Sequence, residues 1–216
     1  MPRILCYGDS NTWGYATVPR ADERYADHER WPNVMGTVLG SNWTVLEEGL
    51  NGRTTVHADP IEGAYLDGSS TLVPILRSHM PLDVVAIMLG TNDLKARFGV
   101  GAYDIASGIG VLLGKMTLAL AGRNAGVPKA LVICPPPILN TFGKFDFFGE
   151  MFAGGREKSL RFPKFYQDVA KEAGASFFDA GTVIATSAYD GIHFDPDMQA
   201  KLGRAVAGVV KSLGVS

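Results

Sequence analysis

The fold is decided near the start of the chain, where a short apolar run passes directly into a polar turn. The stretch reads Ile4-Leu5-Cys6-Tyr7-Gly8-Asp9-Ser10-Asn11-Thr12. A short, continuous apolar run that ends in turn-forming residues is typical of a buried strand in a parallel sheet. Because ligands of open parallel sheets bind beyond the carboxyl ends of the strands, this pattern places Ser10 where such folds carry out chemistry.

Similar apolar runs recur along the chain, and longer segments with helical character separate them. The expected strands cover residues 4–7, 43–46, 84–89, 131–134 and 176–178. The expected helices cover residues 31–39, 71–79, 103–120, 160–173 and 196–213. This alternation predicts an α/β fold, a single three-layer α/β/α sandwich around a central parallel sheet of about five strands.

Two segments differ most from each other in pattern. The last helix has the clearest signal, because its apolar residues recur at helical spacing behind Asp195-Pro196, a typical helix start. Residues 135–155, in contrast, begin with three prolines and end in two glycines. We expect a long loop there, and long loops inside compact domains are usually functional.

Length and composition describe an ordinary globular chain. It has 216 residues, of which 46% are hydrophobic and 19% charged, with a formal net charge of -2. We therefore expect one domain over residues 1–216, with neither nucleic acid nor a membrane as partner. The first apolar run is too short for a signal peptide, so we expect a cytoplasmic protein. Cys6 and Cys134 lie in expected strands and should be buried, reduced thiols.

Polar residues follow a second strand and precede the last helix. The expected strand 84–89 ends in Gly90-Thr91-Asn92-Asp93, and Asp190-Gly191-Ile192-His193 comes just before the last helix. A serine hydroxyl needs a base to accept its proton, and that base needs a third group to orient it. Three residues span at most about 10 Å, so an aspartate can reach a histidine three positions on. The sequence thus predicts a catalytic triad of Ser10, His193 and Asp190, with Asp9 in a structural role.

Acyl transfer through such a triad also requires hydrogen-bond donors for the oxyanion of the tetrahedral intermediate. The expected donors are the backbone N–H groups of Ser10 and Gly52 and the side chain of Asn92. Taken singly, these motifs are common turns and helix caps. Their occurrence together at strand ends favours a catalytic site.

These segments resemble the successive sequence blocks of the SGNH (GDSL-like) hydrolases, whose four namesake residues would be Ser10, Gly52, Asn92 and His193. Further likeness to the bacterial arylesterase and acyltransferase branch lies in GDSNTWG (8–14), EEGL (47–50) and RTT (53–55). The resemblance implies a flavodoxin-like fold, hydrolysis of short acyl esters through an acyl-serine, no metal or other cofactor, and a homo-oligomer. Relatives often have alanine at the position of Gly52; because a backbone N–H is the donor, we expect either residue to serve.

The substrate pocket is expected to be largely apolar. Its expected walls are Trp13, Lys95, Phe148, Phe152 and Ile192. The aromatic stretch at residues 142–152 is interpreted as both a pocket wall and a subunit interface, with packing inside the domain as the alternative. A dry pocket would also permit acyl transfer to alcohols. The expected substrates are small aryl, alkyl or sugar acetates, and the alternative main role is that of a carbohydrate acetylesterase.

Other function classes fit less well. A metal-dependent phosphoesterase would use Asp9, Asn92, Asp93 and His193 as ligands, but the usual Asp-x-His pair is missing. A nucleotide-binding loop fails because Gly114-Lys115 is followed by Met116 and lacks the glycine five positions earlier. The α/β-hydrolase pattern fails because Ser10 is not in a Gly-x-Ser-x-Gly elbow.

Overall fold

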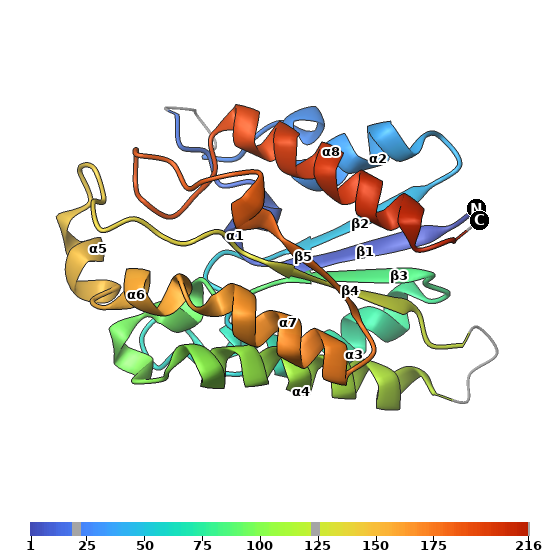
Figure 1. The fold of residues 1–216 in the computed structure, drawn as a ribbon, viewed down its shortest axis with the longest axis horizontal. Helices are drawn as coiled ribbons and strands as arrows, with labels where there is room; N and C mark the ends of the chain where they lie inside the picture. Colours follow the sequence, from blue (N-terminus) through green and yellow to red (C-terminus); the bar gives the residue numbers. More distant parts are fainter. Residues whose placement is uncertain (19–22, 122–125, 216) are drawn as a thin grey trace.

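The computed structural model describes residues 1–18, 23–121 and 126–215. Within them the chain forms a sheet of five parallel strands in the order β2-β1-β3-β4-β5 (Figure 1). The strands are β1 (Arg3–Gly8), β2 (Thr44–Gly49), β3 (Val84–Met88), β4 (Lys129–Cys134) and β5 (Ser176–Asp179). Each expected strand is confirmed, and the strand order is that of flavodoxin-like sheets.

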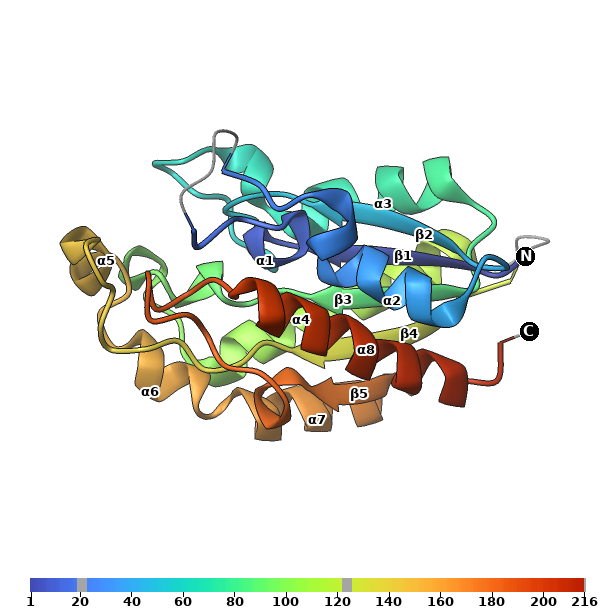
Figure 2. The same ribbon diagram turned by 90° about the horizontal axis from the view of Figure 1, so that it is seen from above.

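Helices cover both faces of the sheet, so the predicted three-layer sandwich is confirmed (Figures 1 and 2). One face carries α2 (Trp31–Leu39) and α8 (Pro196–Ser212), and the other carries α3 (Gly68–His79), α4 (Ala102–Leu120) and α7 (Phe162–Glu172). Side chains of β1 alternate between the two apolar layers, with Cys6 in one and Tyr7 in the other. Cys6 and Cys134 are both free and buried, as expected.

Several short elements were not expected from the sequence. They are the helices α1 (Ser10–Trp13), α5 (Asp146–Met151) and α6 (Gly155–Ser159), and the 3-10 helices η1 (Asp27–Glu29), η2 (Ala64–Leu66), η3 (Asn92–Leu94), η4 (Ala96–Phe98) and η5 (Ala180–Thr182). The long loop expected at 135–155 is thus interrupted by α5. Its aromatic side chains pack on one another, with Phe148 and Phe152 at 5.7 Å between ring centroids, and this packing stabilises a turn of helix in a proline- and glycine-rich segment.

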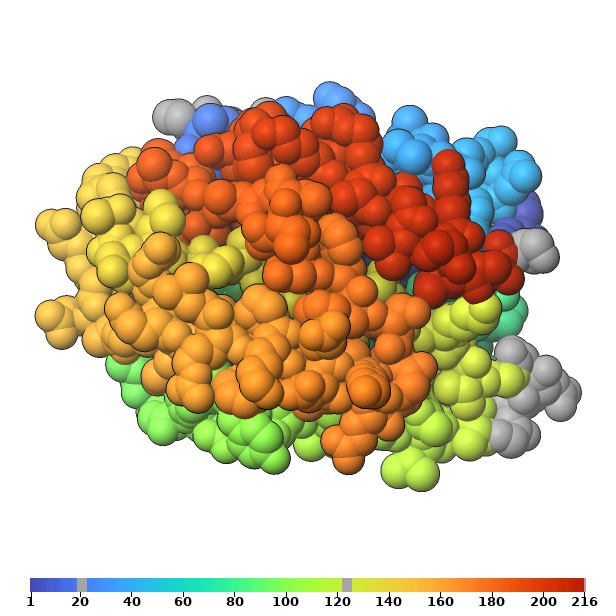
Figure 3. All heavy atoms as spheres, in the orientation of Figure 1, coloured from blue at the N-terminus to red at the C-terminus, as the bar shows by residue number. Residues whose placement is uncertain are grey.

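Helix α4 is long and apolar enough to cross a membrane by length and composition alone. Half of that stretch is buried against the sheet and its neighbours, as in core helices. On the face toward the viewer in Figure 3, the part of the chain around β5 lies between α7 and α8. The first and last described residues lie near each other, at the opposite end of the molecule from α5 (Figures 1 and 2).

Candidate active site

The nucleophile candidate Ser10 is the first residue of α1, directly after β1. Asp9 caps this short helix, and its Oδ1 accepts a hydrogen bond from the N–H of Asn11 at 2.9 Å. A Cβ on Gly8 would lie 2.1 Å from Oγ1 of Thr12, so only glycine lets α1 fold back over the strand end. Burial raises the pKa of Asp9 to about 6. Asp9 is therefore part of the turn that presents Ser10, as the sequence predicted.

The three predicted triad residues meet at this strand end. Nε2 of His193 lies 2.9 Å from Oγ of Ser10, and Nδ1 of His193 lies 2.6 Å from Oδ2 of Asp190. Ser10 and His193 are each 8% exposed or less, and Asp190 is 1% exposed. This is the geometry of a serine nucleophile with its base and the group that orients the base.

Asp190 is held in the ionised form that a triad requires. Its other oxygen, Oδ1, accepts hydrogen bonds from the N–H groups of Ile192 and His193, each at 2.9 Å. Burial alone would raise the pKa of this carboxyl, but the hydrogen bonds and the charge of His193 hold the pKa below its ordinary value. Asp190 is consequently a carboxylate at neutral pH and keeps the proton of His193 on Nδ1.

The loop that carries His193 is tied to the nucleophile turn and to the chain around it. The Asn11 side chain donates to the carbonyl of Ile192 at 3.3 Å. Asp195 accepts hydrogen bonds from Ser187 and Thr17 at 2.6 and 2.5 Å. These contacts fix the distance between the base and the nucleophile, which come from opposite ends of the chain.

Tyr15 is a site residue that sequence reasoning missed. Its ring stacks on the imidazole of His193, with centroids 4.2 Å apart and an interplanar angle of 29°. Tyr15 also lines the cavity in front of Ser10. Its position five residues after Ser10 gives no periodic signal, because the stacking depends on the turn that ends α1.

The predicted oxyanion donors lie around the same cavity, which Ser10, Gly52 and Asn92 all line. The Asn92 amide donates to the carbonyl of Arg53 at 3.1 Å, which joins the segment after β2 to the segment after β3. Gly52 has a left-handed φ of 83°, and a Cβ there would lie 3.0 Å from Cδ1 of Leu66. Alanine at this position would keep the backbone N–H but would be strained, so this backbone favours glycine.

The cavity has a volume of about 310 Å³, and its lining contains apolar and polar side chains, which we call its apolar side and its polar side. The apolar side contains Phe147, Phe148, Met151, Phe152 and Ile192, and the polar side contains Asn51, Glu62 and Lys95. Four of the five expected pocket residues therefore line it. Trp13 does not, and that expectation is corrected: its ring lies beneath the guanidinium of Arg24, 4.8 Å away.

The polar side is backed by a group of four charged residues that we call the charged cluster: Asp59, Glu62, Lys95 and Arg97. Nζ of Lys95 lies 2.8 Å from both carboxylate oxygens of Glu62 and 3.5 Å from Asp59. Arg97 contacts Glu62 at 2.8 Å and Asp59 at 3.3 Å. Only Lys95 of this cluster was singled out from the sequence, because the others lie in a turn and a short helix without a recognisable motif.

A second histidine–aspartate pair lies next to Asn92. Oδ1 of Asp93 lies 2.8 Å from Nδ1 of His57 and accepts a hydrogen bond from the Thr55 hydroxyl at 2.6 Å. Asp93 is fully buried, and His57 is partly exposed. This pair joins the same two segments that Asn92 and Arg53 join.

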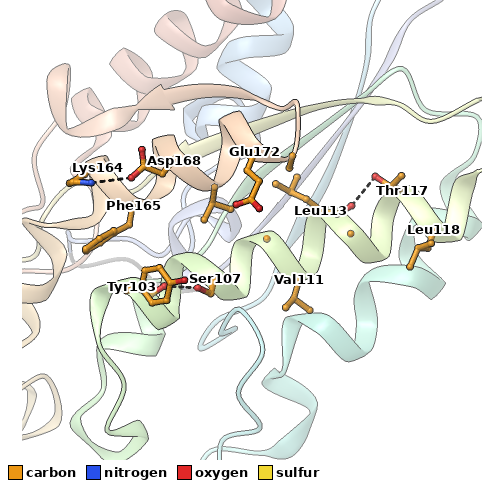
Figure 4. A pocket seen from close by; sticks show the side chains of 14 residues that line it. Tyr103, Ser107, Val111, Leu113, Thr117, Leu118, Lys164, Phe165, Asp168 and Glu172 are labelled. Atoms are coloured by element: carbon orange, nitrogen blue, oxygen red, sulfur yellow. Dashed lines mark hydrogen bonds and ion pairs between the residues drawn. The ribbon is translucent and has the colours of Figure 1, made fainter.

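A larger hollow lies away from the triad, on the outer surface between α4 and α7 (Figure 4). Its volume is about 880 Å³, and Tyr103 and Phe165 meet in it edge to face, with centroids 5.8 Å apart. Lys164 and Asp168 form an ion pair at its rim, at 3.1 Å. No triad residue lines it, so the smaller cavity is the candidate active site.

Comparison with known proteins agrees with this geometry. A model of the GDSL-like lipase/acylhydrolase family matches residues 6–201, which include all three triad residues. The chain belongs to this family. No match was found among curated protein sequences.

Solved structures of several esterases are similar to this protein over almost the whole chain. A carbohydrate acetylesterase from Sinorhizobium meliloti is 40% identical, with a TM-score of 0.91, and covers 99% of this chain and 100% of its own. An aryl esterase from M. smegmatis is 42% identical, with the same TM-score and coverage. A putative arylesterase from Agrobacterium tumefaciens is 40% identical, with a TM-score of 0.86, and covers 98% of this chain and 99% of its own. Together with the triad, these similarities make this GDSL-like protein a serine carboxylic ester hydrolase.

The arrangement in this GDSL-like hydrolase differs from that of a metal-dependent phosphoesterase. Asp9 caps α1 and Asp93 pairs with Thr55 and His57, so both carboxylates are already engaged by groups of the protein. Across residues 1–18, 23–121 and 126–215, no group of three or more His, Cys, Asp or Glu side chains is placed to hold a metal ion.

Proposed function

We propose that this enzyme hydrolyses short-chain acyl esters, with acetates of small aryl, alkyl or sugar alcohols as its substrates. The observation that carries the proposal is a hydrogen-bonded Ser10–His193–Asp190 triad that opens onto a cavity of only about 310 Å³. That volume is at the small end for ligand pockets. Because one side of the cavity is walled by Phe148 and Phe152, a long acyl chain would have to leave the cavity and enter solvent.

The reaction follows from the geometry of the triad. Oγ of Ser10 attacks the ester carbonyl while Nε2 of His193 takes its proton, and Asp190 stabilises the resulting imidazolium. The oxyanion forms beside Asn92 and the backbone of Gly52. His193 then gives the proton to the departing alcohol, which leaves an acetyl ester on Ser10. Water attacks this ester with His193 again as base, so that acetate leaves and Ser10 regains its proton.

The test is a series of p-nitrophenyl esters of acetate, butyrate and octanoate. We expect kcat/KM to fall with each step in chain length and to be lowest for octanoate. Ser10→Ala should abolish both turnover and labelling by a serine-directed phosphonate, without a change in the circular dichroism spectrum. Equal rates for acetate and octanoate would contradict the short-chain proposal, and normal turnover by Ser10→Ala would contradict the triad.

Acyl transfer to alcohols is a second proposed activity, favoured by the apolar side of the cavity. Phe152 is buried and Phe148 packs against the core, while Phe147 is 57% exposed at the outer end of this wall. An alcohol with an apolar body would be enriched there and could take the acetyl group from Ser10 in place of water. We further propose that a second copy of the chain covers Phe147 in a homo-oligomer.

The ratio of ester synthesis to hydrolysis tests both parts of this second proposal. It is measured with p-nitrophenyl acetate and benzyl alcohol in aqueous buffer, together with mass by light scattering. We expect Phe147→Asp to lower both the mass and the ratio. A monomeric parent would contradict the oligomer, and an absence of benzyl acetate would contradict the transfer activity.

A further inference from the structure

Glu62 differs from Lys95 and Asp59 of the charged cluster because its side chain remains partly exposed where it lines the active-site cavity. Its side chain is 35% exposed, whereas those of Lys95 and Asp59 are 3% and 0% exposed. Glu62 and Lys95 both line the cavity. The two cations of the cluster, Lys95 and Arg97, already form ion pairs with its carboxylates. The cluster thus presents the cavity with a hydrogen-bond acceptor.

The position of Glu62 is fixed from two directions. Asp59 accepts hydrogen bonds from the N–H groups of Ile61 and Glu62, at 2.9 and 3.0 Å, and so shapes the turn that carries Glu62. Lys95 and Arg97 hold its carboxylate at 2.8 Å. An acceptor held in this way loses little conformational entropy when a ligand binds, which is the property of a preorganised binding group.

Glu62 also lies close to the reacting centre. Its Oε2 is 3.2 Å from the point where a Cβ on Gly52 would lie, and Gly52 is an oxyanion residue. Lys95 follows η3, which begins with Asn92. A substrate whose carbonyl is polarised by these residues therefore has part of its body within reach of the Glu62 carboxylate.

The chemistry of the substrate decides which part can bind there. A short acyl group and the ester oxygens carry no hydrogen-bond donor, so a donor for Glu62 must come from the alcohol portion of the ester. An apolar alcohol portion would instead displace water from the exposed part of the Glu62 carboxylate without replacing the hydrogen bond that water gives, which is unfavourable. The carboxylate thus distinguishes between hydroxylated and apolar alcohols.

We propose that Glu62 accepts a hydrogen bond from a hydroxyl group on the alcohol portion of the ester, and that the preferred substrates are acetates of polyhydroxylated alcohols such as monosaccharides. This inference rests on the proposed function, because it assigns the alcohol selectivity of the same site. Lys95 and Arg97 are positioning residues for Glu62, and the aromatic side of the cavity receives the apolar face of the sugar ring.

The experiment compares two acetates of similar shape, 6-O-acetylglucose and cyclohexylmethyl acetate, of which only the first carries hydroxyl groups. The ratio of their kcat/KM values is measured for the parent, Glu62→Met and Asp59→Asn. We expect Glu62→Met to lower this ratio by about tenfold to a hundredfold, the range for a hydrogen bond to a charged group. Asp59→Asn removes one charge from the same cluster but keeps a side-chain oxygen for the turn and leaves Glu62 in place, so its ratio should fall by much less than that of Glu62→Met.

An unchanged ratio in Glu62→Met would overturn the proposal, as would an equal fall in Asp59→Asn, which would assign the effect to the integrity of the cluster. Should Glu62→Met fail to fold, Glu62→Gln keeps the shape and a neutral acceptor, and its ratio should fall by about threefold to tenfold. If the parent hydrolyses p-nitrophenyl acetate and either contradicting result is found for the variants, only the proposed role of Glu62 is refuted. A parent that hydrolyses none of the three esters refutes the proposed function instead.

Discussion

Two histidine–aspartate pairs lie beside the same sheet edge, and only one of them is placed for catalysis. The distance from Nδ1 to the carboxylate is 2.6 Å in His193–Asp190 and 2.8 Å in His57–Asp93. Beyond the histidine, however, the first pair reaches Oγ of Ser10, whereas the ring of His57 tilts against that of Phe98 at 5.3 Å. A histidine–aspartate pair therefore occurs in both regions. What makes only the first pair catalytic is that its histidine also contacts a serine hydroxyl.

The two aspartates also differ in what else they hold. Asp190 accepts N–H groups from its own turn, which orients the loop around the base. Asp93 accepts the N–H and hydroxyl of Thr55, a residue of the distant segment that follows Gly52. The first carboxylate thus orients the base of the triad, and the second joins the two segments that carry the predicted oxyanion donors Gly52 and Asn92.

Removal of the two histidines should give the largest difference between the pairs. His193→Ala is expected to lower kcat about a millionfold, as loss of the base does in a serine protease. His57→Ala should lower it by less than about tenfold, because His57 touches no reacting group. Both are measured with p-nitrophenyl acetate at pH 8. A loss in His57→Ala that approached that of His193→Ala would break the distinction.

Replacing each aspartate by asparagine should lower the catalytic rate in one pair and the stability of the fold in the other. Asp190→Asn keeps the shape but favours the wrong tautomer of His193, so we expect a loss of about ten-thousandfold in kcat. Asp93→Asn should instead reduce the free energy of unfolding by about 1–3 kcal/mol, because an amide nitrogen replaces one of the two buried acceptor oxygens of Asp93. Urea unfolding alongside kinetics distinguishes the two. The supporting role of Asp93 would be contradicted if Asp93→Asn lost as much activity as Asp190→Asn while its free energy of unfolding stayed that of the parent.

Asn92 directly precedes Asp93 and lines the cavity together with His193, and its loss should have an intermediate effect. We expect Asn92→Ala to lower kcat by about a hundredfold to a thousandfold, the usual effect of removing one oxyanion donor. KM should change little, because the donor acts on the transition state. The full dependence of rate on substrate concentration checks this. A mutant altered only in KM would show that Asn92 binds the ground state.

The smallest expected effect is a pH-dependent contribution of His57 to stability. The hydrogen bond to Asp93 raises the pKa of His57 above its ordinary value, although partial burial opposes this. Because folding favours protonated His57, the pair stabilises the fold fully below pH of about 6.5, and this contribution is lost as pH rises through the raised pKa. His57→Gln should therefore destabilise by on the order of 1 kcal/mol at pH 5 and by less at pH 9.

Urea unfolding at pH 5, 7 and 9 measures this difference, and His28→Gln, on the exposed surface, is the matched control. A difference between the parent and His57→Gln that is equal at all three pH values would show that His57 contributes by packing and not by its charge.

Much of the fold could be predicted from local patterns in the sequence. Strands such as β1 and β3 are continuous apolar runs, and α8 repeats its apolar residues at helical spacing behind a proline. The polar ends of β1 and β3 also made Ser10 and Asn92 foreseeable, because topology alone brings the ends of neighbouring parallel strands together. His193 and Asp190 could be paired by their spacing.

Other site residues, such as Tyr15 and Glu62, could not be predicted, because their positions depend on the paths of loops. Tyr15 reaches His193 only through the turn after α1, and Glu62 reaches the cavity only because Asp59 shapes its turn. Trp13 shows the opposite error: a position near Ser10 in sequence did not place its side chain in the cavity. Contacts between aromatic side chains likewise created α5 in a segment whose prolines and glycines indicated a loop.

The nucleophile and its base are separated by 183 residues along the chain. The last helix takes part in joining them, since Gln199 of α8 donates to the carbonyl of Asn11 at 3.1 Å and accepts from the N–H of Trp31 at 2.9 Å. A chain emerging from the ribosome therefore exposes Ser10 early but stays catalytically silent until nearly all of it has been made and folded. In the folded protein, any local unfolding that detaches α8 should abolish turnover. The rate of ester hydrolysis can therefore be used to follow the folding and unfolding of the whole domain.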